Sequence, residues 1–405
     1  MSRAFEFFSE YVKVETTAFG SSGTHPSSPG QLDLGRRLVC QLRELGVADA
    51  AISDYGYVMG HLAATPGCEH IPALGLIAHM DTAAEASGKN VKISVVEYSG
   101  GGIVLGTSGL TVEPGERFIG HRLAVTDGTT LLGADDKAGI AAIMALLDEI
   151  RIRKIPHGKL CICFTPDEEI GEGTLFFDVP AFGAEYAFTV DGGNPEEVEF
   201  QNFNAAGAEV VFKGLSCHPG YAKGIMINAA RVAMEFDAML PPGEVPEKTS
   251  GFEGFFHLLD MSGNVSRAES QYIIRDHDAG LFAERKACMT RIAAELNRKY
   301  GEGTVQLKIS DQYRNMEEKV ADCPELLALA DEAVRRAGLI PVHPPIRGGT
   351  DGSKLSFMGL PCPNLGTGGH LAHGEMEFLS IDEQEKVVAI LLNLVNLCCE
   401  EKKVF

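Results

Sequence analysis

Histidine and acidic side chains recur at a few places in the sequence, close to the ends of apolar runs. The candidates share an imidazole nitrogen or a carboxylate oxygen, and they are His79, Asp81, Asp135, Glu168, Glu169, Asp191 and His373. Such donors suit Zn²⁺, with Co²⁺ or Mn²⁺ as alternatives, better than a thiolate site would. A single histidine at a strand end is more often structural, and adjacent glutamates are usually solvated. Because five separate segments present these side chains, the sequence favours a metal centre.

Asp135 and Asp136 stand before Lys137 and an apolar, alanine-rich run at 138–147 that is typical of a buried helix. Acidic side chains near a helix N-terminus are stabilised by the helix dipole, so capping is the simpler interpretation of this pair taken alone. The other segments that carry metal-ligand side chains favour a ligand role for Asp135.

The elements that would position these side chains alternate between strands and helices. Apolar runs at 73–81, 159–166 and 185–190 have the length of strands. The second run is followed by the acidic triplet 167–169, and the third by Asp191. Alternating strands and helices predict an α/β fold with a mostly parallel sheet flanked by helices, in which functional side chains collect beyond the carboxyl ends of the strands.

The pattern changes after residue 205. Residues 206–312 show the order strand, helix, strand, strand, helix, strand, which is the split βαβ arrangement of ferredoxin-like modules. The α/β pattern then resumes with helices at 324–337 and 383–397. The sequence therefore predicts one domain inserted into another, with 1–205 and 313–405 forming the main domain.

Composition and charge exclude several classes of protein. The chain has 405 residues, of which 45% are hydrophobic, and a formal net charge of -21. It lacks the basic clusters that nucleic-acid binding needs, and its apolar runs fall short of the roughly 18 residues of a membrane span. The N-terminus does not follow the pattern of a secretory signal. The ten cysteines show no CxxC spacing, so we expect reduced core thiols in a cytoplasmic protein.

Several motifs resemble those of a known family. They are the segments 78–82, 87–91, 126–139, 165–171, 190–193, 218–220, 272–276, 347–352 and 356–363. On these segments the chain resembles the tripeptide aminopeptidases of the co-catalytic dizinc exopeptidases. This family also contains carboxypeptidase G and succinyl-diaminopimelate desuccinylase. The resemblance covers nearly the whole chain, and the motifs are long and in the same order.

The resemblance implies a zinc-exopeptidase catalytic domain that holds two Zn²⁺ per subunit. His79 and Asp191 would bind one metal ion. Glu169 and His373 would bind the other. Asp135 would bridge the two ions, which in such centres lie roughly 3.5–4 Å apart.

The resemblance also implies catalytic roles near these ligands. Glu168 would be the general base that takes a proton from the attacking water and delivers it to the leaving amine. Asp81, two residues past His79, would orient the imidazole. The peptide bond between Asp135 and Asp136 would be cis.

For the inserted segment, the resemblance implies a lid and dimerisation domain. The protein would be a homodimer in which His218 reaches into the partner subunit's site and stabilises the oxyanion. Arg275 and Arg347 would anchor the carboxylate of the peptide substrate, because guanidinium groups bind carboxylates in a bidentate way. A salt bridge at the surface or in the lid is the alternative for these two arginines.

The sequence around the last ligand departs from the family pattern. Family members have Tyr-Asn-Phe before the ligand histidine and Lys-His where this chain has Glu375-Met376. His373 keeps the His-Gly-x-x-Glu pattern, so we predict it as the ligand in preference to His370. The altered neighbours bear on substrate preference more than on the metal site.

The resulting hypothesis is a cytoplasmic dizinc aminopeptidase that releases the N-terminal residue of tripeptides. A dipeptidase, a carboxypeptidase and an N-acyl-amino-acid deacylase remain alternatives, because the same metal ligands serve the same attack on an amide bond. A catalytically silent peptide-binding protein is a further alternative, against which the presence of Glu168 and Asp135 argues.

Overall fold

The computed structural model describes residues 2–400, and the chain divides into two compact units. The main unit comprises the residues up to Phe200, Met316–Pro344 and the residues from Thr350 onward. The inserted unit comprises Gln201–Asn315 and Pro345–Gly349. Residues 401–405, at the end of the predicted main domain, lie outside the described residues. The assignment of catalytic and lid roles to the two units stays a prediction.

The main unit is built on a seven-stranded mixed sheet with the order β1-β2-β8-β3-β9-β15-β10. Its strands are β1 (Ala51–Ile52), β2 (Val58–Leu62), β8 (Leu160–Thr165), β3 (Leu74–His79), β9 (Tyr186–Gly192), β15 (Asn364–Gly366) and β10 (Val198–Glu199). The central strands β8, β3, β9 and β15 are parallel, whereas the outer strands pair in the antiparallel sense. The predicted parallel sheet is therefore the centre of a mixed one.

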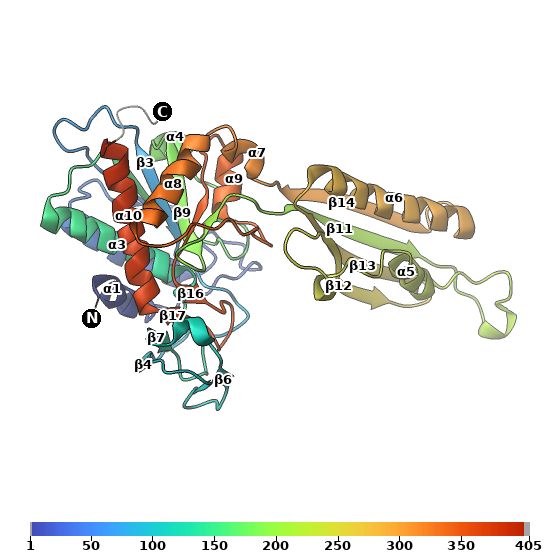
Figure 1. Ribbon diagram of the computed structural model, residues 1–405. Coiled ribbons are helices and arrows are strands. Elements are labelled where there is room, and N and C mark those ends of the chain that lie inside the picture. The colour runs from blue at the N-terminus through green and yellow to red at the C-terminus, as the bar shows by residue number, and fades with distance from the viewer. Residues whose placement is uncertain (1, 401–405) are drawn as a thin grey trace. The chain divides into compact units, whose positions relative to one another are not determined.

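Helices cover both faces of this sheet (Figure 1). They are α1 (Arg3–Tyr11), α2 (Pro29–Glu44), α3 (Ala134–Arg153), α4 (Val179–Phe182), α7 (Glu317–Val320), α8 (Pro324–Arg336), α9 (Asp351–Phe357) and α10 (Ile381–Glu400). Because side chains alternate along a strand, Leu76 and Ala78 of β3 join the core beneath α1, α3 and α10, while Ile77 joins a second core with Phe182 and Leu355.

Strand β3 and helix α3 form the centre of the main unit. All six residues of β3 are buried, as expected of a strand that is covered on both faces. Helix α3 carries buried side chains around most of its circumference and packs on β3, β9, α1 and α10. The apolar run at 138–147 thus forms the buried helix that the sequence predicted.

A second, smaller sheet of the main unit has the order β16-β17-β7-β4. Its antiparallel strands are β4 (Ser94–Glu97), β7 (Arg122–Val125), β16 (Gly369–His370) and β17 (Phe378–Ser380), and a separate hairpin joins β5 (Ile103–Val104) and β6 (Thr111–Val112). The sequence did not predict this sheet, because strands of two to four residues carry too little periodicity.

The inserted unit has the predicted order of elements. They are β11 (Asn204–Lys213), α5 (Ala229–Ala238), β12 (Phe255–Gly263), β13 (Arg267–Asp276), α6 (Ala279–Tyr300) and β14 (Val305–Tyr313). The sheet is antiparallel throughout and has the order β12-β13-β11-β14. Buried and exposed residues alternate along much of β13, because one face of the sheet packs on α5 and α6.

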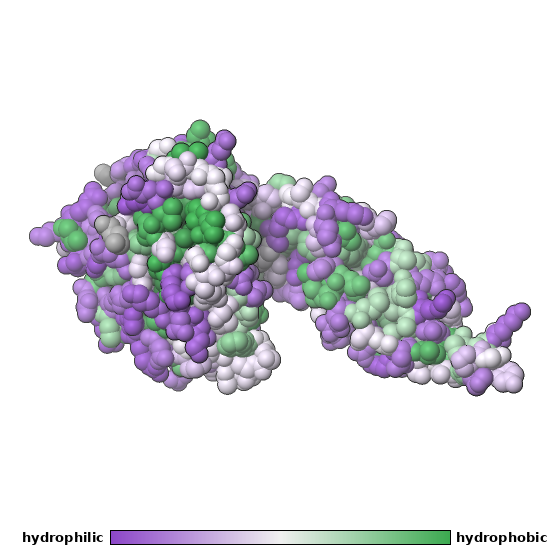
Figure 2. Space-filling model, turned by 90° about the horizontal axis from the view of Figure 1, so that it is seen from below, coloured by the Kyte–Doolittle hydropathy of each residue, from purple (hydrophilic) through white to green (hydrophobic). Residues whose placement is uncertain are grey.

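Three short 3₁₀ turns complete the fold: η1 (Glu116–Phe118), η2 (Pro219–Tyr221) and η3 (Pro246–Lys248). Hydrophilic residues cover much of the face shown in Figure 2, and hydrophobic areas interrupt them on both units. None of the helices within residues 2–400 combines the length and the apolar character needed to cross a bilayer.

Candidate metal centre

The five predicted metal ligands lie together in the main unit. His79 is the last residue of β3, and Asp191 lies near the end of β9. Glu169 follows β8, Asp135 lies in the first turn of α3, and His373 lies in the loop between β16 and β17. The carboxyl ends of three neighbouring parallel strands therefore supply one side of the cluster, as expected for a sheet of this kind.

The carboxylate of Asp135 lies between two histidines. Its Oδ1 atom is 2.8 Å from Nε2 of His79, and its Oδ2 atom is 3.2 Å from Nε2 of His373. Nε2 of His79 is also 3.4 Å from Oδ1 of Asp191. Nε2 of His373 is also 3.1 Å from Oε2 of Glu169. Asp135 thus connects one histidine–carboxylate pair to a second.

The chemistry of this cluster fits a pair of divalent cations. Two imidazoles and three carboxylates are the nitrogen and oxygen donors that Zn²⁺ accepts. The potential ligand atoms of His79, Asp135 and Glu169 lie within 4.8 Å of one another. The Oε1 atom of Glu169 is buried and has no hydrogen-bond partner among residues 2–400. A buried carboxylate oxygen of this kind is stabilised when a cation binds it.

The acidic and basic groups of the cluster shift one another's pKa values. Burial alone would lower the pKa of His79, but Asp191 and Asp135 raise it well above its usual value. Hydrogen bonds with Asp135 and Glu169 raise the pKa of His373 to about 11. Burial alone would raise the pKa of Asp135, yet the hydrogen bonds from His373 and His79 lower it. Cations that bind these two imidazoles must therefore compete with protons.

Asp136 is a near neighbour that was not predicted as a ligand. The peptide bond between Asp135 and Asp136 is cis, as the resemblance implied. The carboxylate of Asp136 accepts hydrogen bonds from the backbone N–H groups of His79, at 3.1 Å, and of Gly139, at 3.2 Å. Burial, followed by the charge of Asp191, raises its pKa well above the usual range. Asp136 therefore ties β3 to the start of α3.

Asp81 contacts both the imidazole of His79 and the two glutamates. Nδ1 of His79 is 3.1 Å from the carbonyl oxygen and 3.4 Å from Oδ1 of Asp81. The Asp81 carboxylate also accepts hydrogen bonds from the backbone N–H groups of Glu168 and Glu169, both at 3.0 Å. This second contact was not predicted. Burial, followed by the charge of Asp351, raises the pKa of Glu168 well above its usual value.

Glu377 is a residue of the site that sequence reasoning missed. It is 1% exposed, and its carboxylate accepts three backbone hydrogen bonds. The donors are the N–H groups of Leu132 at 2.6 Å, Gly133 at 2.7 Å and Asp135 at 3.0 Å. Burial raises the pKa of Glu377 to about 7. Because Glu377 closes the loop that carries His373, it ties that loop to the turn that carries Asp135.

His370 has partners of its own. Its Nε2 atom lies 2.7 Å from Oε2 of Glu383, and its ring stacks on Phe378 at a centroid distance of 4.9 Å. The His-Gly-x-x-Glu pattern was used only to prefer His373 over His370 as the ligand. The glutamate of the same pattern is Glu377. Its contacts with the distant turn at 132–135 were not predicted.

Asn364 of β15 holds the strand that carries Asp191. Its Oδ1 atom accepts hydrogen bonds from the backbone N–H of Asp191, at 3.1 Å, and from the hydroxyl of Thr189, at 2.9 Å. Its Nδ2 atom donates to Oε2 of Glu199 at 2.8 Å. The sequence did not predict that the Asn364 side chain would bind the backbone of Asp191.

The remaining predicted site residues belong to the inserted unit. His218 is exposed in the segment between β11 and α5, where its Nδ1 atom accepts a hydrogen bond of 3.1 Å from the N–H of Gly220. Tyr221, in the same segment, is 78% exposed. Among the contacts of residues 2–400, Nε2 of His218 has no hydrogen-bond partner, because the contact with Gly220 uses Nδ1.

The two predicted anchoring arginines make contacts within the inserted unit. Arg275, on β13, donates to two backbone carbonyls, and its guanidinium carbon lies 5.3 Å from the centre of the Tyr313 ring. Arg347 donates to the carbonyl oxygens of Gly251, at 2.8 Å, and Glu253, at 2.9 Å. A role for either arginine in substrate binding stays a prediction.

Comparisons with known proteins identify the family of the chain. Residues 113–397 match the model of peptidase family M20/M25/M40. Peptidase T of Shouchella clausii is 49% identical over 402 residues, which are 98% of each chain. Peptidase T of Clostridium perfringens is 49% identical over an alignment of 409 positions, which covers 99% of this chain and 100% of the relative.

Solved structures share the fold. Aminopeptidase PepT from Bacillus cereus has a TM-score of 0.79 at 21% identity, and a tripeptidase from Staphylococcus aureus has 0.78 at 21%; each comparison covers 98% of both chains. The Bacillus subtilis YXEP protein, described as a dinuclear metal binding peptidase, has a TM-score of 0.62 at 14% identity and 98% coverage of both chains. On the family match and the near-full-length identity to its relatives, the chain belongs to peptidase family M20/M25/M40.

Proposed function

We propose that the protein is a metal-dependent aminopeptidase that releases the N-terminal residue of tripeptides. The observation that carries this function is the carboxylate of Asp135, which lies between a His79–Asp191 pair and a His373–Glu169 pair. Relatives that are 49% identical over nearly the whole chain are named Peptidase T. Similar folds occur in proteins described as an aminopeptidase and a tripeptidase.

The same five residues would hold two divalent cations, for which we propose Zn²⁺. His79 and Asp191 would bind one cation, and His373 and Glu169 the other, with Asp135 shared between them. When bound, such a pair lowers the pKa of a water molecule and polarises the carbonyl group of the substrate. The chain's own residues then have to orient the peptide and move the proton.

Glu168 is the proposed general base. Its backbone is held next to Glu169 by the carboxylate of Asp81. Burial raises its pKa, which favours proton uptake by this carboxylate. Glu168 would take the proton of the attacking water and deliver it to the leaving amine. A single side chain would thus serve both the removal of a proton from water and the protonation of the leaving amine.

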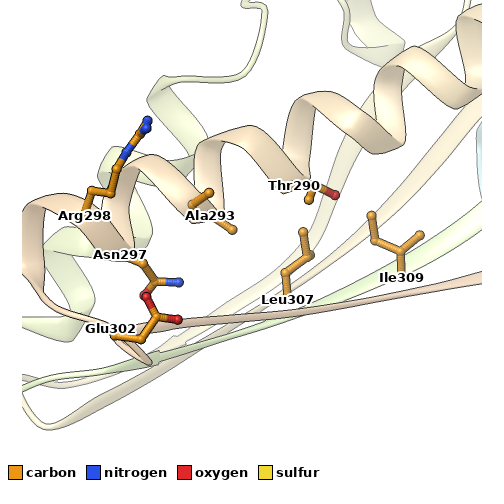
Figure 3. A pocket seen from close by; sticks show the side chains of 8 residues that line it. Thr290, Ala293, Asn297, Arg298, Glu302, Leu307 and Ile309 are labelled. Atoms are coloured by element: carbon orange, nitrogen blue, oxygen red, sulfur yellow. The ribbon is translucent and has the colours of Figure 1, made fainter.

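For the inserted unit we propose a homodimer in which His218 completes the partner subunit's site. Strands β12 and β14 are the outer strands of its sheet, and an outer strand is a ready pairing surface for a second copy. Beside β14, a groove lies between α6 and the sheet (Figure 3). Its lining includes Thr290, Ala293 and Asn297 of α6 and Leu307 and Ile309 of β14. Arg298 and Glu302 also line this groove, so a symmetric partner would meet both apolar and charged side chains there.

A panel of peptides tests the substrate class. Matched di-, tri- and tetrapeptides should be compared, each with a free and with an acetylated N-terminus. We expect the free tripeptide to have the highest kcat/KM, with its N-terminal residue as a product, and acetylation to abolish cleavage. Faster cleavage of dipeptides, of C-terminal residues or of acylated amino acids would instead support the corresponding alternative.

A second prediction concerns metal binding. Chelation should abolish hydrolysis, and Zn²⁺, Co²⁺ or Mn²⁺ should restore it. Because His373, with a pKa of about 11, holds a proton at neutral pH, binding should release protons and the apparent affinity should rise with pH. Calorimetry in two buffers that differ in ionisation enthalpy measures this release. Full activity in a preparation that elemental analysis shows to be metal-free would contradict the prediction.

The adjacent glutamates should differ in their effects. Glu168→Ala should retain metal and lose about 10²–10⁴-fold in kcat, because a general base acts in the transition state. Glu169→Ala should lose metal from one of the two sites. Metal content by elemental analysis and steady-state kinetics separate these outcomes. Equal metal content and equal rates in the two variants would refute the division of roles.

Subunit mixing tests the role of His218. His218→Ala and Glu168→Ala, each inactive alone, are combined and allowed to exchange subunits. In a heterodimer, the site that retains Glu168 receives its histidine from the other chain. A random equal mixture should therefore recover roughly a quarter of the sites. Heterodimers that are demonstrated and yet inactive would show that His218 does not act across the dimer.

A further inference from the structure

The position of the Glu168 carboxylate depends on its backbone. Within residues 2–400, the Glu168 side chain has no hydrogen-bond or ion-pair partner, whereas Glu169 is paired with His373 at 3.1 Å. The N–H groups of both glutamates are held by Asp81. A side chain without its own partner is aimed by the turn that carries it, so the residues that fix this turn decide where the proposed base points.

The turn begins with an unusual backbone conformation at Asp167. This residue has a φ angle of +56°, in the left-handed region that non-glycine residues seldom adopt. It directly precedes Glu168, and its carbonyl oxygen accepts a hydrogen bond from the N–H of Glu172 at 2.9 Å. Consecutive side chains of an extended strand point to opposite faces. The chain therefore has to leave the extended conformation here before Glu168 and Glu169 can serve one site.

Gln31 of α2 holds Asp167 at two points. Its Nε2 atom donates to Oδ1 of Asp167 at 2.7 Å, and its Oε1 atom accepts from the backbone N–H of Asp167 at 3.0 Å. Gln31 and Asp167 are both 0% exposed. Ser27 adds a hydrogen bond from its backbone N–H to Oδ2, at 2.7 Å, and one from its hydroxyl to Oδ1.

These contacts compensate for the strained conformation of Asp167. Its charged side chain accepts three hydrogen bonds from the segment 27–31, and Nδ1 of His25 lies 3.2 Å from Oδ2 as well. Left-handed non-glycine residues persist where their surroundings hold them in place. The N-terminal segment thus supplies the partners that the turn between β8 and the two glutamates requires.

We propose that Gln31 is a positioning residue for Glu168, and that it acts by fixing Asp167 at the start of the turn. Glu169 is additionally held by its partner His373, so a loosened turn affects Glu168 more than the metal ligand. The inference rests on the proposed role of Glu168 as general base. It extends that role to a helix whose residues the metal centre does not use.

Reciprocal exchange of donor and acceptor tests the proposal. Gln31→Glu places a second carboxylate against that of Asp167. Asp167→Asn replaces the acceptor carboxylate with an amide. Each single variant should have a kcat about 10–100-fold lower than the unmodified protein, with KM and metal content unchanged. In the double variant, the introduced amide can donate to the introduced carboxylate. We expect the double variant to recover much of the activity that the single variants lose, as a coupled pair does.

Gln41 provides a matched control on the same helix. It also donates to a carboxylate, that of Glu10 at 3.2 Å, and accepts from the hydroxyl of Tyr11 at 2.9 Å. Gln41→Glu should leave kcat unchanged. If Gln31→Glu does not fold, Gln31→Met takes its place, because it removes both contacts of Gln31 without adding a charge. Gln31→Met should show the same loss of kcat.

Amide hydrogen exchange supplies a readout that does not depend on activity. In Gln31→Met the amides of 167–171 should exchange faster than in the unmodified protein, while those of α6 should not. Normal kcat and exchange in Gln31→Met, or a double variant no better than its parents, would overturn the proposal. If the unmodified protein cleaves no peptide, or Glu168→Ala is fully active, the proposed function fails instead. Hydrogen exchange then still reports whether Gln31 fixes the turn.

Discussion

The contact on which the rest of the main unit depends is the carboxylate of Asp135 between two imidazoles. A partly buried charge is stabilised where opposite charges and hydrogen bonds surround it, and here His79 and His373 contact Asp135 from segments that are far apart in the sequence. Strand β3 ends at His79, and Asp135, at the start of α3, lies next to this histidine. The second, antiparallel sheet brings the loop of His373 to the same place. Both sheets of the main unit thus contribute side chains to this site.

A second layer of buried carboxylates holds the segments that carry the ligands. Asp81 accepts two backbone hydrogen bonds from the turn after β8, Glu377 accepts three from the turn before α3, and Asp167 accepts its bonds from the N-terminal segment. Each joins two stretches of chain that are remote in sequence. Ligands on turns are less precisely placed than ligands on strands, and these acceptors give such turns fixed positions. Much of the acidic character near the centre therefore serves the backbone.

The sequence predicted what depends on local pattern. The apolar run of β3, the helix after Asp136 and the element order of the inserted unit have a period and a length that identify them. The roles of Glu377 and Gln31 could not be predicted in this way, because their partners lie in distant segments that only the folded chain brings together. The short strands β16 and β17 were missed for the same reason, since their pairing with each other and with β7 defines them.

The balance of charge at the centre bears on how a peptide would be recognised. Two divalent cations would match the charges of four carboxylates, and the three proposed ligands, Glu168 and Asp136 supply five carboxyl groups at the centre. Asp81, Asp167 and Glu377 are already engaged by backbone or side-chain donors. A centre whose carboxyl groups match the charge of the two cations has no net positive charge left for the C-terminal carboxylate of a peptide. That carboxylate would need cationic groups of its own, for which guanidinium is the best-suited side chain. The charge of the centre therefore favours a cationic anchor for that carboxylate, and the assignment of this role to Arg275 and Arg347 stays a prediction.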